Sequence, residues 1–199
     1  MLKTHAVAVR ALASDADRLM QTVSFDPQQN YFQLFNIAQA YQIDTAQLER
    51  QYRALQSLIH PDKHAHLPDA EQRVAMQHST LVNEAYQTLL QPILRARYLL
   101  SLHGVDTQEE TNTIMPLDFL TAQMELREGV AEARQARDAA LLGELEMRLH
   151  RETRELEAQL AVKIDTVKDY AAAAGLVRKL RFMEKLAEEI HAAYDAIDV

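Results

Sequence analysis

The stretch LQSLIHPDKHAHLPDAEQ, residues 55–72, interrupts a chain that otherwise has the pattern of helices. Pro61 disfavours the α conformation at His60 and has no amide hydrogen to donate, so a helix that enters this stretch must end there. Asp69, preceded by Pro68, is then placed to cap a second helix. The sequence therefore predicts two antiparallel helices joined by a loop, which is a helical hairpin.

The helix before the loop is expected to have one apolar face and one basic face. Asp44 is placed as its N-cap, with Gln47 in the capping-box position. Arg50 and Arg53 fall on the face opposite to the apolar stripe, where they are expected to be exposed. That stripe consists of Leu48, Tyr52, Leu55 and Ile59.

The helix after the loop repeats the amphipathic pattern, and the short apolar segment 31–37 is expected to lie across the seam between the two helices. The side chains predicted to form its buried face are Val74, Leu81, Val82, Ala85 and Leu89.

Composition favours an all-α fold for the whole chain. The 199 residues are 48% apolar and include only 4 Gly and 5 Pro, fewer breakers than an all-β fold needs. Cysteine is absent, which excludes disulfides and thiolate metal sites. The net charge is −8, and no segment has the basic surplus of a nucleic-acid-binding protein. No apolar run is long enough to span a membrane, so we expect a cytoplasmic protein that binds neither nucleic acid nor membrane.

Polar and breaker residues divide the chain into four parts. An N-terminal extension, residues 1–28, precedes an N-terminal module, residues 29–104. Residues 105–115 contain no periodic pattern and are expected to form a linker. Residues 116–199 are expected to form an antiparallel three-helix bundle. The helices predicted in this bundle span about 116–136, 138–164 and 166–197, with Asp138 capping the second and either Asp165 or Thr166 capping the third.

The first helix of the bundle carries two apolar stripes on nearly opposite faces. One stripe, with Phe119, Leu126 and Val130, can pack into the bundle. The other contains Leu120 and Met124 and is flanked by charge, as at many binding sites. From periodicity alone, this second stripe either packs against the N-terminal module or stays exposed. The predicted binding surface comprises Leu120, Met124, Glu125, Glu128 and, from the last helix, Phe182.

Several motifs resemble a known family. The tripeptide His60-Pro61-Asp62 between two amphipathic helices resembles the J-domain of DnaJ-type co-chaperones, as does LVNEAYQTL at 81–89. Three further motifs resemble the HscB-type co-chaperones of iron–sulfur cluster assembly: RARYLLSLHG at 95–104, LTAQMELREG at 120–129 and RKLRFMEKL at 178–186. The resemblance covers about residues 29–198 and implies an L-shaped protein.

The resemblance implies two partners and no chemistry of the chain's own. An HscA-type chaperone of the 70-kDa heat-shock family would bind the loop and the basic helix face, and an IscU-type iron–sulfur scaffold would bind the second apolar stripe. Thr121 departs from the apolar residue that is frequent there in relatives. No catalytic residue, metal ligand or cofactor is expected. The implied chaperone-binding residues are His60, Pro61, Asp62, Arg50, Arg53 and Lys63.

Three other interpretations stay open at this level. The tripeptide could be a plain turn, since Pro and Asp are common turn residues. The C-terminal module could select a different client protein. The histidines of the loop, His60, His64 and His66, could hold a metal in a small helical enzyme, although their spacing is not diagnostic.

Overall fold

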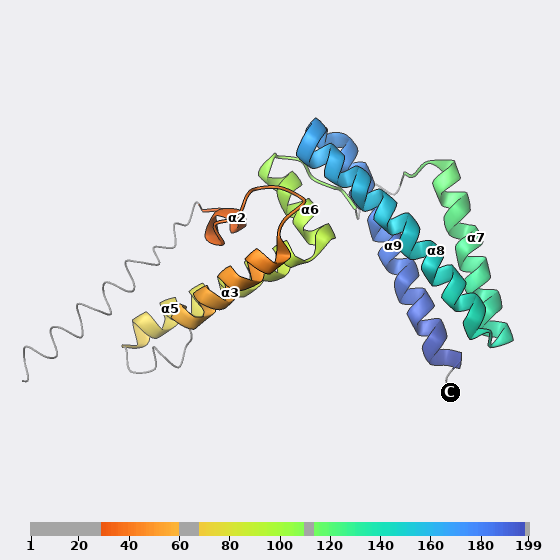
Figure 1. Ribbon diagram of the computed structural model, residues 1–199, viewed down its shortest axis with the longest axis horizontal. Helices are drawn as coiled ribbons and strands as arrows, with labels where there is room; N and C mark the ends of the chain where they lie inside the picture. The colour runs from red at the N-terminus through yellow and green to blue at the C-terminus, as the bar shows by residue number, and fades with distance from the viewer. Residues whose placement is uncertain (1–28, 60–67, 110–113, 198–199) are drawn as a thin grey trace, which may run out of the picture.

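The computed structural model describes residues 29–59, 68–109 and 114–197, and every regular element in these ranges is a helix (Figure 1). The predicted all-α fold is therefore confirmed. None of these helices is both long and apolar enough to cross a membrane. The elements are α2 (Tyr31–Leu34), α3 (Thr45–Ile59), α5 (Asp69–Leu90), α6 (Pro92–Leu102), α7 (Leu117–Ala136), α8 (Ala139–Ala161), the π-helix η1 (Val162–Val167) and α9 (Tyr170–Ile197).

Helices α3 and α5 form the predicted hairpin, with α2 lying against α5 (Figure 1). Tyr52 of α3 stacks on Tyr86 of α5, with ring centroids 4.0 Å apart. Tyr31 of α2 donates a hydrogen bond from its hydroxyl to the Glu84 carboxylate of α5 at 3.0 Å. The first contact joins the two helices of the hairpin, where the aromatic pair adds specific geometry to the burial of apolar surface, and the second attaches α2 to α5.

The buried face of α5 is rotated slightly from the one predicted. Val82, Ala85 and Leu89 are buried as expected. Val74 and Leu81 are 39% and 36% exposed, and Ala75 is buried instead. Val74 and Leu81 are seven positions apart, so they lie on the same edge of the apolar stripe. The buried face is centred slightly to one side of the predicted centre, which leaves both residues partly exposed.

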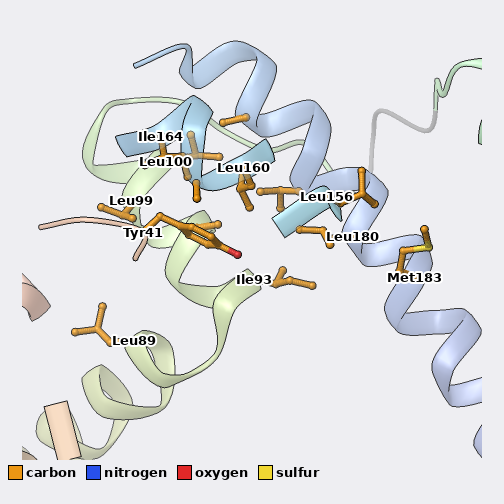
Figure 2. Close-up of a cluster of buried hydrophobic side chains, with 14 of the residues drawn as sticks. Tyr41, Leu89, Ile93, Leu99, Leu100, Leu156, Leu160, Ile164, Leu180 and Met183 are labelled. Atoms are coloured by element: carbon orange, nitrogen blue, oxygen red, sulfur yellow. The ribbon is translucent and has the colours of Figure 1, made fainter. Parts of the chain in front are cut away.

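Helices α7, α8 and α9 form the predicted bundle, and α6 lies at the corner between this bundle and the hairpin (Figure 1). The two arms diverge from this corner, which confirms the L shape. Apolar side chains from both arms meet there in one buried cluster, which we call the elbow core (Figure 2). The labelled members of the elbow core are Tyr41, Leu89, Ile93, Leu99, Leu100, Leu156, Leu160, Ile164, Leu180 and Met183.

Two of the predicted helix caps are confirmed. Asp44 accepts a hydrogen bond from the Gln47 amide at 3.0 Å at the start of α3. Asp138 accepts one from the Leu141 amide at 3.0 Å at the start of α8. Each carboxylate satisfies an amide that has no partner within its helix.

Two other predicted caps are wrong. Pro68 occupies the N-cap of α5, and Asp69 is the first residue inside the helix, where its charge still favours the helix dipole. Neither Asp165 nor Thr166 caps α9, because η1 continues the preceding helix through both residues. The cap of α9 is Asp169, which accepts a hydrogen bond from the Ala172 amide at 3.1 Å.

The described part of the predicted linker is attached to helices on both sides. Arg97 of α6 binds both carboxylate oxygens of Glu109. Arg178 of α9 donates a hydrogen bond to the Thr107 carbonyl at 2.9 Å. The absence of periodicity therefore marks irregular backbone that is nevertheless anchored to α6 and α9.

Candidate functional site

The basic face of α3 points to solvent. The side chains of Arg50 and Arg53 are 68% and 76% exposed. Arg50 lies 3.9 Å from an Asp44 oxygen, and Arg53 lies 2.5 Å from a Glu49 oxygen. Because exposed ion pairs of this kind contribute little to stability, both cations can exchange these carboxylates for those of a partner at small cost.

The motif residues His60, Pro61, Asp62 and Lys63 lie outside the described residues, as do His64 and His66. The described helices on either side nevertheless fix where the motif occurs in the chain. Helix α3 ends at Ile59, which is 5% exposed, and α5 begins at Asp69. In the sequence, the tripeptide therefore lies between the last residue of α3 and the first residue of α5.

The two apolar stripes of α7 have different environments. Leu126, Val130 and Ala133 are buried in the bundle. On the other stripe, Leu117 and Met124 are 80% and 61% exposed. Leu120 is half-buried, and Glu125 and Glu128 are exposed. The two stripes were thus correctly separated by periodicity, and much of the second one faces solvent.

The alternative partner considered for the second stripe, the N-terminal module, is engaged elsewhere. Tyr98 stacks on Tyr31 with ring centroids 4.3 Å apart, and its hydroxyl accepts a hydrogen bond from the Tyr31 amide at 2.9 Å. Leu99 is buried in the elbow core. Neither side chain is therefore available to cover Leu117 and Met124.

Phe182 of α9 lies beside α7 through a contact that the sequence did not suggest. Its ring meets Phe119 edge to face, with centroids 6.1 Å apart. The Lys179 ammonium lies 5.3 Å from the centroid of the Phe119 ring. Phe119 had been assigned to the buried stripe, yet it is half-buried at the seam between α7 and α9. The signal in the sequence that could have indicated this contact is a Phe at the edge of an apolar stripe on each of the two helices.

The charges near Phe182 are fixed by local pairing. Arg181 donates a hydrogen bond to Glu184 at 2.9 Å, and this hydrogen bond raises the pKa of Arg181 above its usual range. Arginine is protonated at neutral pH with or without such a shift, so the pairing with Glu184 fixes where this charge lies. No group of three or more His, Asp or Glu side chains within the described ranges could hold a metal ion. The described residues thus place two exposed arginines on one arm and an exposed apolar stripe on the other.

Comparison with known families matches both arms. Residues 30–98 match the DnaJ domain, and residues 115–191 match the HSCB C-terminal oligomerisation domain. A relative from Azoarcus sp. (strain BH72), named Co-chaperone protein HscB homolog, is 47% identical over 176 residues, which cover 88% of this chain and 99% of the relative.

Solved structures give the same result. Chaperone HscB from Vibrio cholerae has a TM-score of 0.75 and 35% identity, covering 85% of this chain and 99% of that one. The human co-chaperone protein HscB has a TM-score of 0.79 and 34% identity, covering 84% of this chain and 83% of that one. The relatives are named as co-chaperones. They therefore favour the co-chaperone interpretation over that of a small enzyme with a metal held by the loop histidines. The chain belongs to the HscB family of J-domain co-chaperones.

Proposed function

We propose that this protein stimulates the ATPase of an HscA-type chaperone of the 70-kDa heat-shock family and delivers an IscU-type iron–sulfur scaffold to it in the cytoplasm. The observation that carries the proposal is the pairing of two surfaces on one L-shaped body. An exposed basic face lies on α3, and an exposed apolar stripe lies on α7 of the other arm. Membership of the HscB family supports both partner assignments.

The chaperone contact is proposed to be electrostatic. Arg50 and Arg53 steer acidic groups of the chaperone towards α3, and Asp62 of the motif pairs with a basic group. Such pairing biases the partner towards ATP hydrolysis, which closes it on its client. Only a few basic residues take part, so the docking is weak and sensitive to salt.

The scaffold contact is proposed to be mainly apolar. Met124 and Leu120 supply the surface that the scaffold covers, with Phe182 beside them and Glu125 and Glu128 at the rim. A central apolar patch with a charged rim is the usual anatomy of a protein interface. Because the two surfaces are on different arms, both partners can bind at once, and the client is present where hydrolysis is triggered.

The test is steady-state ATP hydrolysis by an HscA-type chaperone with wild-type protein and with Asp62→Asn. Wild type is expected to raise turnover, and the variant is expected to lose this stimulation because the loop carboxylate no longer carries charge. The matched control is Asp195→Asn, which makes the same change at an exposed residue near the end of α9 and should stimulate the chaperone as wild type does. Equal stimulation by wild type and Asp62→Asn would refute the chaperone half of the proposal.

The scaffold half has its own measurement. Size-exclusion chromatography of the full chain with an IscU-type scaffold should give a complex, and the Leu120→Ala, Met124→Ala, Phe182→Ala triple variant should not form it. Chaperone stimulation without any complex would instead point to a different client protein.

A further inference from the structure

Asp165, which was predicted as a helix cap, has a different role in the structure. It lies in η1, the π-helix between α8 and α9. Its Oδ1 accepts a hydrogen bond from the Tyr41 amide at 2.7 Å, and its Oδ2 accepts one from the Gln42 amide at 2.9 Å. One carboxylate of the bundle thereby binds two consecutive amides of the segment that leads into α3.

The π-helix explains how this carboxylate reaches the other arm. Leu156, Leu160 and Ile164 continue one buried stripe from α8 into η1 and lie in the elbow core (Figure 2). Asp165 follows Ile164 directly, so it is held at the edge of that core. The wider π turn ends at Lys168, whose φ of 60° reverses the chain before α9. Turns of this kind are rare and recur at functional sites.

The amides that Asp165 binds belong to a segment whose side chain is part of the elbow core. Tyr41 is only 4% exposed, and the Arg95 guanidinium lies 5.2 Å from the centroid of its ring. Fixing the Tyr41 backbone therefore fixes the position of this ring among the apolar residues of both arms. Other polar and aromatic contacts at the elbow attach α6 and the residues after it to α9: His103 stacks on Tyr170, and Arg178 binds the Thr107 carbonyl. The Asp165 hydrogen bonds instead attach the segment that leads into α3.

We propose that Asp165 is a positioning residue that sets the angle between the α3 arm and the bundle, and so aligns the chaperone-binding and scaffold-binding surfaces. This inference rests on the proposed function, which needs both partners on one molecule. The hydrophobic effect is non-directional, whereas hydrogen bonds to a charged oxygen are short and add geometric specificity.

The length of the arms converts a small rotation at the elbow into a large displacement at the binding surfaces. Helix α3 starts at Thr45, just after the anchored residues Tyr41 and Gln42, and Ile59 lies fourteen residues further along it, which is about 21 Å at 1.5 Å per residue. A rotation of about 10° at the elbow would displace Ile59 by about 4 Å, more than the length of a hydrogen bond. An alignment suited to two partners therefore needs a directional constraint near the pivot.

The first test measures the angle without any partner. The chain has no native cysteine, so spin labels attach only at introduced sites. Gln77→Cys on α5 and Ala192→Cys on α9 are both exposed and lie on different arms. The distance distribution between the labels should be narrow in wild type and broader in Asp165→Ala, with Asp165→Asn, which keeps one acceptor oxygen, in between.

A matched control separates positioning from general stability. Asp138→Ala removes a carboxylate that also accepts a backbone hydrogen bond, but at the start of α8, away from the elbow. It should lower the melting temperature and leave the label distances unchanged. An unchanged distribution in Asp165→Ala, or equal broadening in Asp138→Ala, would overturn the inference.

The second test measures the consequence for function. With the chaperone alone, Asp165→Ala should stimulate ATP hydrolysis within about twofold of wild type, because the α3 surface is intact. With the scaffold added, the extra stimulation should fall several-fold. Failure of wild type to stimulate the chaperone would refute the proposed function, whereas the label distances test the role of Asp165 independently. Full scaffold-dependent stimulation by Asp165→Ala would overturn the positioning role.

Discussion

Replacing Met124 by alanine should weaken scaffold binding without unfolding the protein. The side chain is 61% exposed on α7, so the fold uses little of its apolar surface. Fully burying a Met side chain contributes about 1.5–3 kcal/mol. The exposed 61% leaves about 1–2 kcal/mol for a partner to gain, which corresponds to roughly a 5- to 30-fold higher Kd in the variant.

Isothermal titration calorimetry with an IscU-type scaffold measures this Kd, and circular dichroism records melting. Met147→Ala is the matched control, because Met147 is 66% exposed but lies on α8, outside the proposed surface. Both variants should melt within a few degrees of wild type, and only Met124→Ala should bind more weakly. An unchanged Kd in Met124→Ala, or an equal rise in Met147→Ala, would refute the assignment of this stripe to the scaffold.

Two further predictions concern the other arm and the elbow. Reversing both charges in Arg50→Glu, Arg53→Glu should lower chaperone ATPase stimulation several-fold at low salt and less at high salt. The control is Arg151→Glu, Arg154→Glu on α8, an equally spaced and exposed pair that should have no such effect. A loss of stimulation that does not depend on salt would contradict electrostatic docking. Burial raises the pKa of Tyr41 above its ordinary value of about 10, so the unfolded chain releases this proton at a lower pH than the folded protein does. The free energy of unfolding should therefore decline as the pH rises above about 10. Because the Tyr41 hydroxyl has no hydrogen-bond partner among the described residues, Tyr41→Phe should keep the free energy of unfolding at neutral pH or raise it by up to about 1 kcal/mol. The stability of this variant should also fall less in alkali. Urea unfolding measures both, and a loss of more than about 1 kcal/mol at neutral pH would contradict the prediction.

Local patterns predicted the parts of the fold that depend on neighbours in the sequence. The caps Asp44 and Asp138 act within a few residues, so the helices that begin after them were correctly placed. The two stripes of α7 were also separated correctly, because helical periodicity decides which residues share a face.

The parts that sequence reasoning missed depend on contacts between distant residues. Asp165 has the local pattern of a cap, yet its partners are Tyr41 and Gln42, more than 120 positions earlier. Nothing in periodicity indicates that η1 continues α8 past the expected boundary. Periodicity placed Phe119 in the buried stripe. It could not indicate the contact with Phe182, because that contact depends on how α7 and α9 pack.

The most direct test of the central claim is the ATP turnover of an HscA-type chaperone when this protein and an IscU-type scaffold are supplied together. If one L-shaped molecule presents a client to the chaperone that it stimulates, turnover should exceed the sum of the increases caused by each protein alone. An increase that is merely additive, or none at all, would contradict the account.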